Sequence, residues 1–401
     1  PALAWMKSIN IFSALASALF LYLISLQLQL SKRAAVVGVA TFLASNYTLM
    51  TVLSGEWHIP ALALSLAGLY NTILYLEHEK PRSMYAGALL FAFAICYHMA
   101  ALSFFVPAAL MVLFSRPLKG RWSSIVLAGA IVSLSVILVY AVLPFLLFHF
   151  DSVSDFLRTF LIYKFLNHIR YSGFEWLLVA VQTLSHSLAV IPSSSSVLYW
   201  LSFPIFLGII AIIWRFYRSS HPKKIKILFV MTVLWWPAVQ GVFDARANGM
   251  NGWPFVLPIL CFLIAETLNR LESRAFFLAA LLPVIILSWN FWHLILPNRT
   301  HKRDEIFLFR APEDLPKTTP VAFVIGELVS SIPEIWYAGS QLGFRNQIHF
   351  FPCCGEGNYI FRLSRYASAS VGWSQSTVEN AGTRLESGGP SLFLHYADYD
   401  R

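Results

Sequence analysis

The chain has 401 residues, of which 57% are hydrophobic and 12% are charged, and its mean hydropathy is +0.64. A soluble globular chain carries about 25% charged residues, so this composition excludes a soluble protein and predicts a chain that crosses a membrane several times. The net charge of +9 would suit a nucleic-acid-binding protein by its sign, but the positions of the charges, given below, argue against that class.

Apolar runs follow one another through the first three-quarters of the chain. A helix needs about 20 apolar residues to cross the hydrocarbon core of a membrane. The run from 83 to 115 is divided in two at "CYHMA", around His98. Ten spans are therefore predicted, near residues 9–30, 34–53, 59–76, 83–97, 100–115, 123–149, 196–214, 226–243, 253–269 and 275–296.

The connections between these spans differ in charge. Taken alternately, one set carries about fourteen Lys and Arg residues and the other about four. The positive-inside rule places the first set in the cytoplasm, with membrane lipids as its partners and no nucleic acid. The second set and both ends of the chain then face outward. The first set comprises 31–33, 77–82, 115–121, 214–226 and 269–274, and the second comprises 54–58, 97–100, 150–195 and 244–253.

The long connection at 150–195 needs an interpretation of its own. Residues 151–176 interleave charged and apolar residues at roughly helical spacing, which predicts an amphipathic helix in the membrane interface. The apolar stretch 177–191 could cross the membrane as an eleventh span. Crossing would move every later basic connection outside, so the charge pattern favours a segment that re-enters or lies flat.

The tail, 298–401, is less hydrophobic and richer in Gly, Ser, Pro and charge. Its pattern predicts strands at 321–327, 346–352 and 389–398, with a helix at 331–343. The predicted fold is therefore a membrane all-α bundle of about ten transmembrane helices in residues 1–297. A small extracytoplasmic α/β domain follows in residues 298–401.

Ionisable residues gather in the less basic connections. Glu56 and His58 occupy a short gap between two apolar runs, His98 divides another run, and Asp244 and Arg246 follow a third. Ionisable groups held deep in a membrane are costly and usually functional, so these residues could line one external cavity. At the membrane boundary the cost is small, and they could equally be wetted hairpin residues.

Cationic side chains suggest how an anionic substrate would be held. Arg246 could bind a phosphate through paired hydrogen bonds, or it could pair with Asp244 or with a lipid headgroup. Lys164 and Arg170 lie on one side of the predicted interfacial helix and could attract a lipid-linked anion, or contact ordinary headgroups. No Walker loop, HExxH, GxSxG or GxGxxG pattern is present in the sequence, which disfavours an ATPase, a zinc protease and an α/β hydrolase.

Four stretches resemble the GT-C superfamily of membrane glycosyltransferases. They are "INIFSALASALFLYLISLQL", "ATFLASNYTLMTVLSGEWHIPALALSLAGLYNTILYL", "YAGALLFAFAICYHMAALSFFVPAALMVLF" and "DARANGMNGWPFVLPIL". The second has the superfamily's acidic residue near the outer end of a span, followed by "PAL" at the start of the next. The pair Glu56–Trp57 is similar to the protein O-mannosyltransferase-like branch.

This resemblance implies transfer of a hexosyl or pentosyl group from a polyprenyl-phosphate donor. The acceptor would be a lipid, a glycan or a protein at the outer face of a prokaryotic inner or plasma membrane. A divalent metal, Mg²⁺ or Mn²⁺, would suit this chemistry. The implied catalytic residues are Glu56 and His58, and the implied substrate-binding residues are His98, Lys164, Arg170, Asp244 and Arg246.

One departure from the superfamily pattern concerns the start of the chain. The main catalytic carboxylate of these enzymes usually follows the first span, whereas the first run here resembles the second span. The first span and that carboxylate are therefore expected upstream of Pro1. Two other classes remain open: a polytopic transporter or flippase, and a noncatalytic membrane subunit. The charges cluster at one face and no repeated pair of broken helices is visible, which disfavours a transporter.

Overall fold

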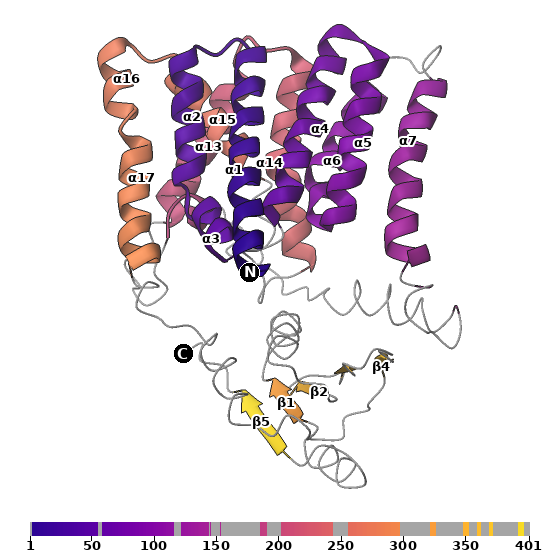
Figure 1. Cartoon of the computed structure of the whole chain (residues 1–401). Coiled ribbons are helices and arrows are strands. Elements are labelled where there is room, and N and C mark those ends of the chain that lie inside the picture. Colours follow the sequence, from indigo (N-terminus) through magenta and orange to yellow (C-terminus); the bar gives the residue numbers. More distant parts are fainter. Residues whose placement is uncertain are drawn as a thin grey trace. The chain divides into compact units, whose positions relative to one another are not determined.

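The structure is a computed structural model. It describes residues 2–54, 58–115, 122–143, 145, 153, 185–190, 202–243 and 256–296, and five strands in the tail. The helical part is a bundle in which successive long helices run in opposite directions (Figure 1). Its helices are α1 (Ala2–Gln27), α2 (Lys32–Ala44), α3 (Asn46–Ser54), α4 (His58–His78), α5 (Pro81–Tyr97), α6 (Leu102–Phe114), α7 (Trp122–Ile137), α13 (Ser202–Tyr217), α14 (Lys223–Phe243), α15 (Leu257–Leu268), α16 (Ser273–Ala279) and α17 (Leu282–Asn290). Short 3₁₀ or π turns at Met99–Ala101, Leu138–Val142 and Phe291–Ile295 adjoin them.

Each of the ten predicted spans overlaps a described helix or helix pair. By length and apolar composition, four of them qualify as membrane spans, or five if the bent pair α2–α3 counts as one. Helices α6, α13 and α15 are apolar but shorter than a full crossing within their described bounds. The structure thus supports a polytopic membrane protein, and the count of ten stays a prediction.

The predicted span at 34–53 is not one straight helix. It breaks at Ser45, where the backbone becomes extended, and α3 leaves α2 at an angle of 55°. The hydroxyl of Ser45 lies 2.6 Å from the Phe42 carbonyl oxygen and 3.1 Å from the Thr48 hydroxyl. Short polar side chains that bond nearby backbone in this way compete with the helical hydrogen bonds and favour a break.

Helix α4 lies at the centre of the bundle and packs against α5 and α1. In the most apolar stretch of α4, 72% of the residues are buried inside the structure. The corresponding share is 6% for the span that begins with α7, a helix that packs on α5. Small residues let some helices approach closely: a Cβ added to Gly38 in α2 would lie 2.8 Å from the Ala265 Cβ and 3.1 Å from the Cys261 carbonyl oxygen in α15. Such close contacts through small residues are typical of helix packing in membranes.

The two ends of the bundle carry different residues. The connections 28–31, 79–80, 218–222 and 269–272 lie at one end (Figure 1). Gln27 Nε2 donates to Glu77 at 2.8 Å, and the backbone N–H of Ser31 donates to the Asn269 side chain at 3.2 Å. Four of the five connections predicted to be cytoplasmic from their Lys and Arg content adjoin this end, which we call the basic end. The opposite end contains α3, the start of α4 and the end of α5, and we call it the histidine end.

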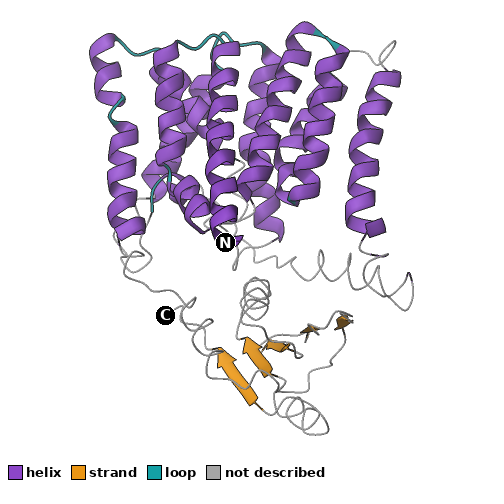
Figure 2. Cartoon of the chain, in the orientation of Figure 1, coloured by secondary structure: helices purple, strands orange, loops and turns teal. Residues whose placement is uncertain are grey.

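The tail contains strands, coloured orange in Figure 2. The strands β1 (Val321–Ile325), β2 (Ile348–Pro352) and β5 (Leu392–Tyr396) form a parallel sheet in the order β2-β1-β5. The strands β3 (Tyr359–Phe361) and β4 (Ala369–Val371) form an antiparallel pair. The three parallel strands fall inside the three predicted ranges, while the helix predicted at 331–343 lies outside the described residues.

The chain divides into two compact units. The first comprises residues 1–142 and 165–298, and the second comprises residues 143–164 and 299–401. The boundary at 297–298 and the outward position of the tail stay predictions.

Candidate functional site

Two histidines from separate helices meet at the histidine end. His58 is the first residue of α4 and is 8% exposed, and His98 caps the C-terminus of α5. Their ring centroids lie 4.2 Å apart, with the ring planes inclined at 57°. The fold therefore brings together two imidazoles that are 40 positions apart in the sequence. Imidazoles can donate, accept or carry a proton near neutral pH, so such a pair suits substrate binding and proton transfer.

Local backbone geometry fixes the ring of His98. The residue is extended (φ −155°, ψ 126°), which ends α5, and its own N–H donates to the Ala94 carbonyl at 2.8 Å. Its Nδ1 accepts a hydrogen bond from the backbone N–H of Ala100 at 3.1 Å. A neutral imidazole has one donor and one acceptor nitrogen, so the proton of neutral His98 lies on Nε2. The turn thus presents Nε2 of His98 as a hydrogen-bond donor.

Buried amides hold α3, the short helix that leads to the Gly55–Glu56–Trp57 segment. Asn10 is 3% exposed, and its Nδ2 donates to the Thr51 carbonyl at 3.1 Å. Asn46 is 1% exposed, and its Nδ2 donates to the His186 carbonyl at 2.8 Å. Since a buried amide without hydrogen bonds is costly, these contacts fix α3 against α1 and against the segment 185–190.

Asn290 connects the same segment to two further helices. It is fully buried, and its Nδ2 donates to the carbonyls of Ala44 at 2.9 Å and Leu188 at 3.0 Å. Its Oδ1 accepts from the N–H of Val190 at 2.9 Å, and the neighbouring Trp289 Nε1 donates to the Val190 carbonyl at 2.8 Å. Residues 185–190 are therefore bonded to α17, and the Asn290 side chain also bonds the end of α2.

Sequence reasoning did not single out Asn10, Asn46 or Asn290. The available signal was a lone amide in an apolar run, because such a group must find hydrogen-bond partners once it is buried. The sequence gives no information on which distant carbonyl that partner is. These three residues act on the backbone of the histidine end, so they position the candidate site.

Of the site residues predicted from the sequence, the structure describes His58 and His98 and brings them together. The other five lie outside the described residues: Glu56, Lys164, Arg170, Asp244 and Arg246. Glu56 precedes His58 by two positions in the sequence. Within the described part of the chain, no group of three or more His, Cys, Asp or Glu side chains is placed to hold a metal ion.

Comparison with known proteins gives a likeness of fold. No protein-family model and no curated protein sequence matches the chain. Among solved structures, the chain is similar to the crystal structure of ArnT from Cupriavidus metallidurans bound to undecaprenyl phosphate. The TM-score is 0.57 at 10% sequence identity, over 91% of this chain and 83% of that chain. This likeness concerns the fold, and it agrees with the polytopic helical bundle expected from the sequence, while membership of the GT-C superfamily stays a prediction. The protein O-mannosyltransferase-like branch stays a prediction.

Proposed function

We propose that the protein is a GT-C-type membrane glycosyltransferase that takes its sugar from a polyprenyl-phosphate donor. The observation that carries this proposal is the likeness of fold, over 91% of the chain, to ArnT, whose crystal structure contains undecaprenyl phosphate. The proposal places the reaction, and Glu56 with it, at the histidine end, where His58 and His98 meet.

In the proposed reaction, an acceptor hydroxyl oxygen attacks the anomeric carbon of the sugar, and the bond from that carbon to the phosphate oxygen breaks. The hydroxyl proton passes to a carboxylate, and the polyprenyl phosphate leaves with the bonding electron pair. Glu56 and His58 are assigned to the lining of the sugar pocket. Two imidazoles held 4.2 Å apart would orient the sugar hydroxyls by hydrogen bonding.

The negative charge on the leaving phosphate requires cationic or hydrogen-bonding partners. Arg246 is assigned to this phosphate, because a guanidinium binds two phosphate oxygens at once. Lys164 and Arg170 are assigned as further cations for the lipid-linked anion, and Asp244 as a partner that orients Arg246. Nε2 of His98, the donor side of its neutral ring, could bond either a sugar hydroxyl or a phosphate oxygen.

A divalent metal would be an additional component of the proposed site, beyond the residues named above. The described residues supply two imidazoles at the histidine end, and a Mg²⁺ or Mn²⁺ site prefers several oxygen ligands. The described residues therefore do not by themselves form such a site, and the reaction above passes no step through a metal.

The test measures binding of undecaprenyl phosphate to the purified full chain by native mass spectrometry. Arg246→Ala should weaken binding by about tenfold or more, since a charge-assisted contact contributes on the order of 1.5–3 kcal/mol. Lys119→Ala, in a connection predicted at the opposite face, is the matched control and should bind like the wild type. Equal binding by both variants would remove Arg246 from the site. A wild-type chain that binds no undecaprenyl phosphate would overturn the proposed donor class.

A further inference from the structure

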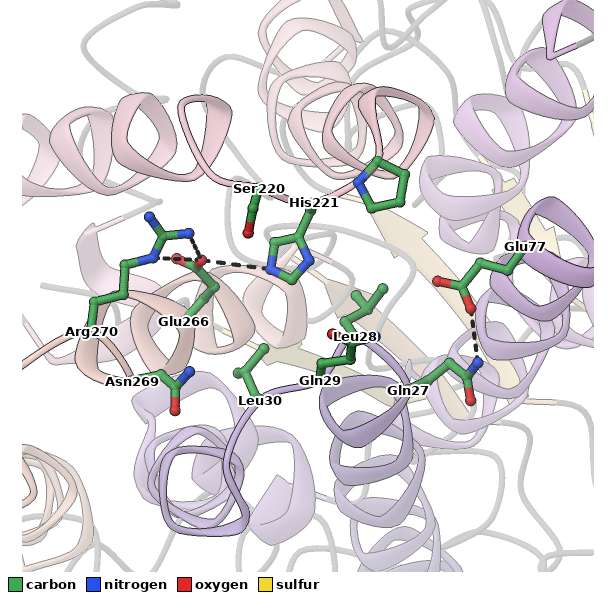
Figure 3. A pocket seen from close by; sticks show the side chains of 11 residues that line it. Gln27, Leu28, Gln29, Leu30, Glu77, Ser220, His221, Glu266, Asn269 and Arg270 are labelled. Atoms are coloured by element: carbon green, nitrogen blue, oxygen red, sulfur yellow. Dashed lines mark hydrogen bonds and ion pairs between the residues drawn. The ribbon is translucent and has the colours of Figure 1, made fainter.

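The basic end contains an open pocket that plays no part in the proposed reaction. It has a volume of about 500 Å³ and is formed by four segments: the α1–α2 connection, the end of α4, the α13–α14 connection and the end of α15 (Figure 3). This volume lies within the range of small-molecule sites. Its lining residues are Gln27, Leu28, Gln29, Leu30, Glu77, Ser220, His221, Pro222, Glu266, Asn269 and Arg270.

Glu266 is the buried charge of this pocket. Its side chain is 3% exposed, and Oε1 accepts hydrogen bonds from Nε and Nη2 of Arg270. His221 Nε2 lies 3.6 Å from the same oxygen (Figure 3). Its second oxygen, Oε2, is buried and has no hydrogen-bond partner among the residues that the structure describes. A buried carboxylate oxygen without a donor is costly, so this atom favours a ligand that can donate a hydrogen bond.

Glu77 supplies the second carboxylate. Its Oε2 accepts from Gln27 Nε2 at 2.8 Å, a neutral partner, and among the described residues it forms no ion pair. The one guanidinium of the lining, on Arg270, is already bonded to Glu266. The pocket therefore has an excess of negative charge, although the surrounding connections are rich in Lys and Arg, and it should attract a cation rather than an anion.

The lining also restricts the kind of cation. It offers carboxylate oxygens and the side-chain carbonyls of Gln29 and Asn269, which all accept hydrogen bonds. It includes no Phe, Tyr or Trp ring, whereas quaternary ammonium groups are usually held by aromatic faces. Leu28, Leu30 and Pro222 provide apolar surface for a short alkyl chain. A protonated primary amine on a small aliphatic group fits this combination.

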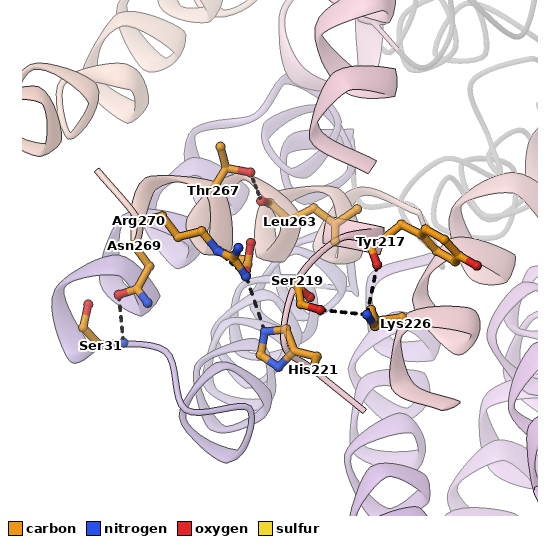
Figure 4. Close-up of polar contacts among 10 residues, drawn as sticks. Ser31, Tyr217, Ser219, His221, Lys226, Leu263, Thr267, Asn269 and Arg270 are labelled. Carbon is orange, nitrogen blue, oxygen red and sulfur yellow. Dashed lines mark hydrogen bonds and ion pairs between the residues drawn. The ribbon is translucent and has the colours of Figure 1, made fainter. Parts of the chain in front are cut away.

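Hydrogen bonds join the segments that form the pocket wall, so the wall is formed without a ligand. Ser31 N–H donates to Asn269 at 3.2 Å, which joins the start of α2 to the end of α15 (Figure 4). Lys226 Nζ donates to the carbonyls of Tyr217 at 2.9 Å and Ser219 at 2.7 Å, which closes the α13–α14 connection. A preformed wall lowers the free-energy cost of ordering the site on binding.

We infer that this pocket binds a protonated primary amine, supplied either by the headgroup of an ethanolamine lipid or by a free aliphatic amine in the water at the basic end. Glu77 is the charged partner of the ammonium group, and Glu266 is a buried acceptor beside it. The inference does not depend on the proposed transfer reaction, because its site lies at the other end of the bundle and its test measures binding alone.

The test uses the full chain in nanodiscs of phosphatidylcholine and phosphatidylglycerol. Ethanolamine should bind saturably in equilibrium dialysis and raise the unfolding midpoint, while choline, which has the same charge but no N–H donors, should do neither. Glu77→Gln should weaken ethanolamine binding by about tenfold or more, since it removes a charge-assisted hydrogen bond. Glu79→Gln, on an exposed residue two positions away that does not line the pocket, should bind like the wild type.

The source of the amine is decided by replacing phosphatidylcholine with phosphatidylethanolamine. If the lipid headgroup is the natural occupant, the unfolding midpoint rises without added amine, and free ethanolamine adds nothing further. If a free amine is the occupant, ethanolamine binds equally in both nanodiscs. Saturable binding of choline with the same affinity, unchanged binding by Glu77→Gln, or no saturable binding of ethanolamine in either nanodisc would overturn the inference.

Discussion

Burial controls the charge of His186, in the segment that Asn46 and Asn290 hold. Removal from water lowers the pKa of this imidazole from 6.5 to about 4. The folded protein therefore keeps His186 neutral at pH values where the unfolded chain binds a proton. Between about pH 6.5 and pH 4 the unfolded state binds more protons, so this contribution to stability is complete above pH 6.5 and is lost as the pH falls.

We therefore expect His186→Gln to reduce the acid sensitivity of the purified protein. A pKa difference of this size corresponds to about 3 kcal/mol across the full window. The measurement is thermal unfolding in detergent at pH 7.5, 6.5, 5.5 and 4.5 for the wild type and the variant. The midpoint of the wild type should fall more steeply below pH 6.5 than that of the variant. Parallel curves would mean that His186 is not held neutral in the folded state.

The sequence singles out residues whose chemistry is unusual for their surroundings, and their role in a site stays a prediction. His58 and His98 were singled out because ionisable groups in short gaps between apolar runs are rare, and the structure brings them together. Asn290 was missed because its three backbone partners, Ala44, Leu188 and Val190, are as far as 246 positions away. Which carbonyl a buried amide meets depends on the packing of the bundle, and apolar periodicity does not encode it.

At the level of helices, apolar length predicted where elements occur and missed how they bend. The run at 34–53 has no Pro or internal Gly cluster to indicate a break, and Ser45 and Thr48 produce one through hydroxyl contacts. The last run, at 275–296, divides into α16 and α17 at the turn 280–281, with Pro283 in the first turn of α17. Proline is compatible with the first turn of a helix and disfavours continuation of the preceding one, so this second break had a visible signal.

Gly38 gives a prediction at this scale. Gly38→Ala would place a Cβ against Ala265 and the Cys261 carbonyl, so α2 and α15 must separate slightly, at a cost of about 1–3 kcal/mol. Gly129→Ala, in α7, is the matched control, because a Cβ there meets nothing within 4 Å. The unfolding midpoint in detergent should fall for Gly38→Ala. It should stay level or rise for Gly129→Ala, since alanine favours helix more than glycine does. A similar shift in both variants would contradict close packing at Gly38.

For the whole molecule, charge counting predicted that most basic connections share one end, and the described helices agree. The same reasoning did not foresee that this end would contain an acidic pocket. Glu77 was visible in the sequence only as one charge in a mixed run, and Glu266 as an acid inside an apolar one. Their convergence with Gln27, His221 and Arg270 depends on how α1, α4, α13 and α15 pack together, which is a property of the bundle as a whole.

The orientation of the bundle is the last prediction. Since cytoplasmic connections carry the excess of Lys and Arg in membrane proteins, the basic end should face the cytoplasm of a bacterial host. Lys80 is exposed in the α4–α5 connection, so Lys80→Cys reports this end in a background with all four natural cysteines replaced by alanine. A membrane-impermeant maleimide should label it in inside-out vesicles and not in right-side-out vesicles. An alkaline phosphatase fused after Arg401 should be active, because the tail is predicted to lie outside. Labelling of Lys80→Cys in right-side-out vesicles would invert the bundle and place the histidine end, with its proposed donor site, on the cytoplasmic side.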